Sequence, residues 1–223
     1  MRGGSLVVNH DRRRTLASIA ALVSMGALAV PGQPQPRLQP QTETQPSPQP
    51  VKPFSFPEDR EKVFLFFQFG CPFSASLHAS AINWARTLPP SIVFARIPVV
   101  FATQDKPAAI AHSIVRILAP QRLDEFEYVV FDDVAKGSSP YDASTYSKAL
   151  KLVGVDPSQY KQRSVQDAIA ARVQRMTRLG WQYRVEVTPS VAVGGNLLLT
   201  PGHVNGDFQQ LFQLVGAAVS RLF

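Results

Sequence analysis

Cys71 is the residue best suited to chemistry, and it is the only cysteine among the 223 residues of the chain. A single thiol excludes an internal disulfide, a Cys-x-x-Cys redox pair and a zinc site built from several thiolates of this chain. The local sequence is Cys71-Pro72-Phe73-Ser74, so a serine stands three residues after the thiol. The chemistry open to Cys71 is nucleophilic attack by its thiolate, with any second thiol supplied from outside.

The elements around Cys71 favour the thiolate. A nearly continuous apolar run at 63–69 predicts a strand that is buried on both faces of a sheet. Apolar residues then recur at helical spacing as far as Leu88, where a Pro-Pro pair ends the predicted helix. A second apolar run, 92–101, predicts another strand, and the three elements together predict a parallel strand–helix–strand unit. Cys71 lies between the first strand and the helix, where backbone amides and the helix dipole stabilise a negative charge.

The four histidines are the other candidate groups. His78 follows Ser74 by one helical turn on the same face, and two interpretations stay open. It handles protons or supports the thiolate, or it is a partly exposed helix histidine without a chemical role. His112 lies in an apolar helical stretch and is predicted to be a packing residue. Because the histidines are far apart in the sequence, with no acidic partner at ligand spacing, neither a metal site nor a bound cofactor is predicted.

Two segments, 66–74 (FFQFGCPFS) and 187–196 (VTPSVAVGGN), resemble the DsbA-like branch of the thioredoxin superfamily. The first is similar to the family's active-site region, which carries Cys-Pro-x-Cys, and the second to its cis-proline strand and hairpin. The resemblance implies an α/β thioredoxin-like fold with an inserted helical subdomain at about 103–180. The sequence of that segment has helical patterns of its own, with Asp156-Pro157 predicted as a helix cap and first turn.

The resemblance also implies roles for individual residues. Cys71 is the expected nucleophile, Ser74 stands in the place of the family's second thiol, and Pro189 is expected to pack beside Cys71 after a cis peptide bond. The substrate-binding residues that it implies are Pro72, Phe73 and Thr188. Phe73 is expected to be exposed, where an apolar ring favours binding to unfolded or hydrophobic peptide.

The sequence departs from the family at three positions. Ser74 cannot resolve a mixed disulfide as a thiol does, although its hydroxyl can donate a hydrogen bond to the thiolate. Leu65 and His78 stand where the resemblance implies carboxylates. These departures favour disulfide isomerisation or glutathione-dependent reduction over net disulfide donation. The co-reactant is then an external thiol, such as glutathione or the thiol of a partner protein.

Three interpretations of the function follow. The first is an exported monothiol oxidoreductase or isomerase that acts on cysteine-containing or unfolded envelope proteins. The second is a redox-inert thioredoxin-fold protein that binds peptides or acts as a chaperone in an envelope secretion or conjugation assembly. In the third, Cys71 forms a disulfide with a second copy of the chain, because an odd cysteine in an exported protein favours intermolecular pairing.

The N-terminal residues predict export to the periplasm. Residues 1–29 contain Arg12-Arg13-Arg14, an uncharged stretch and an Ala-Leu-Ala sequence at 27–29 that has the form of a signal-peptidase site. The arginines fit the twin-arginine route, the apolar stretch also fits the general secretory route, and an uncleaved segment would be a membrane tether. Residues 30–53 are rich in proline and glutamine and predict an extended linker or a segment without a role. Residues 54–223 are predicted to form one folded domain.

The net charge of +7 does not indicate nucleic-acid binding. Four of the arginines lie within residues 1–29, and the remaining basic residues are scattered among acidic ones. A nucleic-acid-binding surface would require a basic patch or stripe, and the sequence shows none. We therefore expect proteins, and not nucleic acids, as partners.

Overall fold

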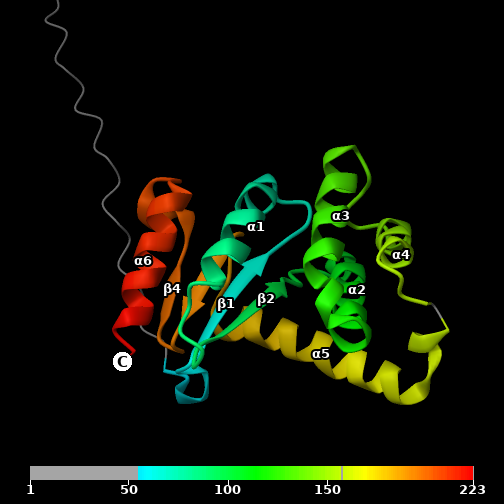
Figure 1. Ribbon diagram of the computed structural model, residues 1–223, viewed down its shortest axis with the longest axis horizontal. Helices are drawn as coiled ribbons and strands as arrows, with labels where there is room; N and C mark the ends of the chain where they lie inside the picture. The colour runs from blue at the N-terminus through cyan, green and yellow to red at the C-terminus, as the bar shows by residue number, and fades with distance from the viewer. Residues whose placement is uncertain (1–54, 157, 223) are drawn as a thin grey trace, which may run out of the picture. The chain divides into compact units, whose positions relative to one another are not determined.

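The computed structural model describes residues 55–156 and 158–222 (Figure 1). The predicted export segment and linker, residues 1–53, lie outside the described residues. Within the described part, no helix has both the length and the apolar character that a membrane span needs.

Four strands form one mixed sheet in the order β2-β1-β3-β4. The central strand β1 (Lys62–Phe67) is parallel to β2 (Val93–Pro98) and antiparallel to β3 (Ser190–Val193). β3 is in turn antiparallel to β4 (Leu197–Leu199). Because α1 (Pro72–Ala85) connects the two parallel strands, the predicted strand–helix–strand unit is confirmed.

Helices cover both faces of the sheet, which explains the continuous apolar pattern of β1. Successive side chains of a strand point to opposite faces. Val63 and Leu65 pack with residues of α1 and of the C-terminal helix α6 (Phe208–Ser220). Phe64 and Phe66 pack on the other face, with the C-terminal half of α5 (Arg163–Gln182).

The remaining helices are inserted between β2 and β3, as the resemblance implies. They are α2 (Lys106–Leu118), α3 (Leu123–Ala135) and α4 (Ala143–Leu152), followed by α5. Figure 1 shows α2, α3 and α4 grouped beside the sheet, with α5 leading from them to β3. These helices share a core with Phe67 and Phe69, so the end of the first apolar run packs in the helical part and not in the sheet. The short 3-10 turns are Pro57–Asp59, Thr103–Asp105, Pro120–Arg122, Gln159–Lys161 and Pro201–Val204.

The predicted helix cap at Asp156 is wrong. The Asp156 carboxylate accepts a hydrogen bond from the Ser158 amide at 2.8 Å, which closes a local turn. α5 begins only at Arg163, and its N-cap residue Gln162 makes no side-chain capping bond. Pro157 lies outside the described residues.

Candidate functional site

Cys71 is the N-cap residue of α1, and Pro72 is the first residue of that helix. Proline suits this position because its fixed φ matches the helix and its missing N–H would have no helical partner there. The thiol is half-buried. Its Sγ donates a hydrogen bond to the carbonyl oxygen of Thr188 at 3.1 Å. The Thr188–Pro189 peptide bond is cis, so the expected geometry of that bond is confirmed, and the two motifs meet at the thiol.

The surroundings of Cys71 shift its equilibrium toward the thiolate. Burial raises the pKa of the thiol, but hydrogen bonds that Thr188 and Ser74 can supply to the thiolate form lower it by more. The resulting pKa lies below the ordinary value of 9.0. Since the thiolate is the nucleophilic form, the position favours reaction at sulfur.

Ser74 is buried one helical turn after Cys71, where it is 3% exposed. Its hydroxyl has no hydrogen-bond partner within the described part of the chain. A buried polar group without a partner calls for an explanation. When Cys71 loses its proton, the Ser74 hydroxyl is a free donor for the thiolate, which is the role that the sequence predicts for it.

The substrate-facing residues expected from the sequence lie around Cys71. Phe73 is 59% exposed, as expected, and its ring centroid is 6.0 Å from that of Phe208 on α6. Pro72 is exposed as well, whereas Thr188 is half-buried and Pro189 is buried. A small pocket of about 80 Å³ also adjoins Cys71, and its lining residues include Gln68, Pro98, Pro140, Tyr141 and Tyr146. Cys71 therefore lines a small pocket and lies two residues before the exposed ring of Phe73.

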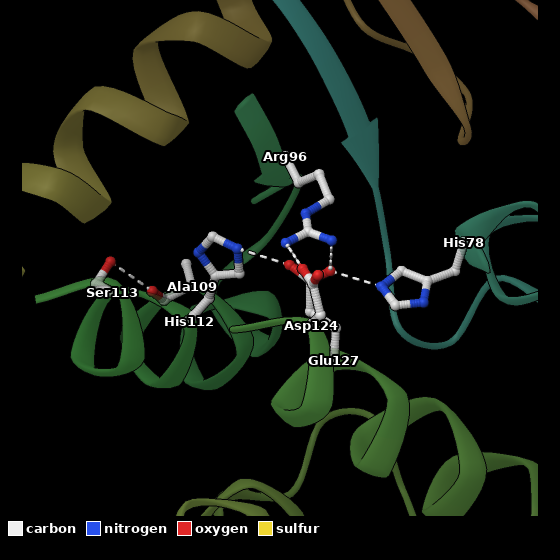
Figure 2. A network of polar contacts seen from close by, with 7 residues as sticks. All are labelled: His78, Arg96, Ala109, His112, Ser113, Asp124 and Glu127. Carbon is white, nitrogen blue, oxygen red and sulfur yellow. Dashed lines mark hydrogen bonds and ion pairs between the residues drawn. The ribbon is translucent and has the colours of Figure 1, made fainter. Parts of the chain in front are cut away.

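A polar network centred on the buried Glu127 connects His78 on α1 with residues of three other elements (Figure 2). The carboxylate of Glu127 on α3 is fully buried. It contacts His78 Nε2 at 2.6 Å and His112 Nε2 at 3.0 Å. Arg96 Nη1 on β2 lies 3.1 Å from the same carboxylate, and Arg96 Nη2 lies 2.5 Å from Asp124 Oδ1. The network thus joins α1 and β2 to the inserted helices α2 and α3.

Glu127 is ionised in this network. Burial raises the pKa of its carboxyl group, but hydrogen bonds from His112 and His78 and the charge of Arg96 lower it to about 2. An ionised carboxylate only accepts hydrogen bonds, so each histidine donates its Nε2–H. Burial lowers the pKa of His112 even though Glu127 opposes the effect, which favours the neutral ring.

The structure corrects two expectations about the histidines. His78 is not partly exposed, since it is 8% exposed and bonded to Glu127. An acidic partner does lie near His78 and His112, because α3 places Glu127 between them. Residues distant in sequence meet here through packing of the inserted helices. Across residues 55–156 and 158–222, no group of three or more His, Cys, Asp or Glu side chains is arranged to hold a metal ion.

Glu127 is the site residue that sequence reasoning missed. The residues that pack α3 into the core are Leu123, Phe126, Val130 and Phe131. In helical spacing Glu127 falls on this apolar stripe, four residues after Leu123. A lone carboxylate on an apolar helix face is the signal that predicts a buried, paired acid.

Comparison with known proteins agrees with the thioredoxin-like fold. No family model matches the chain. The thiol:disulfide interchange protein DsbA of Bordetella parapertussis is 25% identical over 154 residues, which cover 69% of this chain and 73% of that protein. The DsbA structure from Pseudomonas aeruginosa superimposes with a TM-score of 0.67 at 18% identity, covering 77% of this chain and 91% of that one. A peptide-bound DsbA from Proteus mirabilis gives a TM-score of 0.61 at 13% identity, covering 76% of this chain and 95% of that one.

The curated relatives are named thiol:disulfide interchange proteins, and the similarity to them covers about 70% of this chain. The architecture is that of the DsbA structures, with a thioredoxin-like sheet and inserted helices. The active-site motif differs in having one cysteine. In fold and in sequence the chain is therefore similar to DsbA proteins, and it carries a single cysteine in the motif that resembles their active site.

Proposed function

We propose that the protein catalyses disulfide isomerisation or thiol-dependent disulfide reduction through Cys71. The observation that carries the proposal is a thiol of lowered pKa at a helix N-terminus beside Thr188, in a chain without a second cysteine. The thiolate can begin an exchange reaction. No thiol of the same chain can complete it.

The proposed reaction starts when the Cys71 thiolate attacks one sulfur of a substrate disulfide. The substrate S–S bond breaks, a bond between Cys71 and the substrate forms, and the released substrate thiolate takes up a proton. In isomerisation, another substrate thiolate attacks the mixed disulfide, so a different disulfide forms and Cys71 is regenerated. In reduction, two molecules of an external thiol such as glutathione are oxidised to one disulfide while the substrate disulfide becomes two thiols.

The surface beside Cys71 supports a protein substrate. Phe73, two residues after Cys71, offers an exposed aromatic ring that contacts the ring of Phe208, and the Thr188 carbonyl accepts a hydrogen bond from the thiol. We propose that an extended substrate segment lies over Cys71, against the Thr188–Pro189 backbone, with Phe73 contacting an apolar side chain. The peptide-bound DsbA of similar fold is consistent with such binding.

The proposed location is the periplasm, with cysteine-containing envelope proteins as substrates. The support is the arginine-led apolar segment within residues 1–29 and its Ala-Leu-Ala sequence. If the segment is retained, it tethers the protein to the membrane, and the proline-rich residues 30–53 then space the domain from the surface.

A redox-inert peptide-binding protein is the second candidate function. The exposed ring of Phe73 favours it, because peptide binding at this surface needs no second thiol. A Cys71-linked homodimer is a further outcome that one experiment distinguishes from both.

The test is an exchange assay on a protein that carries scrambled disulfides, with and without glutathione. We expect the wild-type chain to accelerate native pairing or reduction only when glutathione or a free substrate thiol is present. Cys71→Ser should lose the acceleration completely. Non-reducing gels of the same samples should show complexes of the chain with substrate. Equal rates for wild type and Cys71→Ser would support the inert protein, and a band of twice the chain mass as the only disulfide-linked species would support the homodimer.

A further inference from the structure

A second pocket of about 260 Å³ lies at the β2 edge of the sheet, bordered by α1, β2, α2, α3 and α5. None of its lining residues also lines the pocket beside Cys71. Four arginines contribute to the wall, and they are Arg86, Arg96, Arg116 and Arg172. Asp124 is the one acidic residue in the lining. Like charges gathered around one pocket repel one another, and a bound negative charge would reduce that repulsion.

Within residues 55–156 and 158–222, carboxylates pair with only one of the four arginines. Arg96 has a side chain that is 9% exposed, and it pairs with Glu127 and Asp124. Asp124, the acidic residue of the pocket lining, is therefore already paired with Arg96. Within the described part of the chain, Arg86, Arg116 and Arg172 have no ion pair with a carboxylate. Among the described residues, three arginines therefore line the pocket without a partner of opposite charge.

Arg172 differs from the other two arginines because part of its guanidinium group is buried. Its Nε atom is buried and has no hydrogen-bond partner among the described residues. Burial and the positive charges of Arg116 and Arg175 lower the pKa of Arg172. A buried donor without an acceptor costs free energy, and neighbouring positive charges add to that cost. A bound anion would remove both costs.

We propose that this pocket binds a small oxyanion that carries several negative charges, of the size of pyrophosphate. Guanidinium groups bind phosphate and carboxylate oxygens through paired N–H donors, and the pocket lining includes Arg86 directly after α1, Arg116 on α2 and Arg172 on α5. Ile82, Ala85 and Phe94 form an apolar part of the wall, which reduces the competition from water. The volume lies below the usual range for drug-sized ligands, which restricts the occupant to a small molecule.

Calorimetric titration of the full chain with pyrophosphate tests the proposal, at an ionic strength held constant with sodium chloride. We expect saturable binding to wild type, and a Kd that is roughly tenfold or more weaker in Arg172→Gln and in Arg116→Gln, because each loses a charge-assisted hydrogen bond. Arg116 is exposed, so its replacement should leave folding intact even if replacement of half-buried Arg172 does not. Thermal unfolding of each variant checks this.

Arg60→Gln is the matched control, since Arg60 is an exposed arginine that does not line the pocket. Its affinity for pyrophosphate should equal that of wild type. Absence of saturable binding to the wild-type chain would overturn the proposal. So would an equal loss of affinity in Arg60→Gln and Arg116→Gln, because binding would then follow the overall charge of the protein and not the pocket.

Discussion

Ser74→Cys is expected to shorten the lifetime of a Cys71 mixed disulfide by about tenfold or more, because an intramolecular thiol attacks far more often than a dilute external one. Residue 74 is one helical turn from Cys71, so its side chain lies on the same helix face. The native hydroxyl is buried beside the thiol and cannot attack sulfur. The variant should form a disulfide between Cys71 and the introduced thiol and release the bound thiol. Mass spectrometry over time, after one exposure to oxidised glutathione, measures this.

Ser76→Cys is the control for the added thiol. Ser76 is exposed on the same helix, and its hydroxyl donates to the Phe73 carbonyl. At five residues from Cys71 it does not share the helix face that Ser74 occupies. The mixed disulfide at Cys71 should persist in this control as it does in wild type. A mixed disulfide that persists equally in Ser74→Cys and wild type would show that Cys71 is not presented to position 74 as the structure indicates.

Glu127→Ala is expected to lower the free energy of unfolding by about 3 kcal/mol or more, because it leaves the buried Arg96 charge and two buried histidines without their shared acceptor. Arg96 retains only Asp124, which is 53% exposed. The control is Glu125→Ala on the same helix. Glu125 is 46% exposed and pairs with Arg122, so its loss should cost less than about 1 kcal/mol. Denaturant unfolding of both variants at neutral pH measures the difference, and similar costs would contradict a structural role for the network.

The pH dependence of the free energy of unfolding, measured for wild type and Glu127→Ala, provides a further check on the Glu127 prediction. The folded-state pKa of Glu127 is about 2, below the ordinary value of 4.5. A depressed carboxyl pKa stabilises the fold above pH 4.5, and this stability is lost as the pH falls from 4.5 toward 2. The part of the stability gap between wild type and Glu127→Ala that comes from the Glu127 charge should therefore narrow as the pH falls from 4.5 toward 2.

Local patterns predict the elements that carry Cys71. The apolar run at 63–69, the proline after the thiol and the second apolar run give a parallel unit, and that unit is present. Each of these signals is local, since strand pattern, helix spacing and proline act over a few residues. The meeting of Cys71 with Thr188 is not local, because 117 residues separate them. Only the resemblance of both motifs to one family predicted that contact.

The contacts of the buried network around Glu127 could not be predicted from the sequence. His78 and Glu127 are 49 residues apart, and their contact depends on how α3 packs against α1. Helical periodicity places a residue on a face but does not say which helix lies opposite that face. From the sequence alone, His78 therefore has no identifiable partner, and the four arginines around the second pocket have no identifiable common site. α5 likewise starts later than predicted, since a local turn uses the Asp156 carboxylate.

The rate of Cys71 alkylation as a function of pH tests the central claim most directly. Iodoacetamide reacts with the thiolate, and the single cysteine ensures that one site is modified. The account predicts that the wild-type rate rises with a midpoint below the ordinary thiol pKa of 9.0, because Thr188 and Ser74 stabilise the anion. Ser74→Ala should move the midpoint upward by removing one donor. A wild-type midpoint at or above 9.0 would contradict the claim that Cys71 is an activated nucleophile.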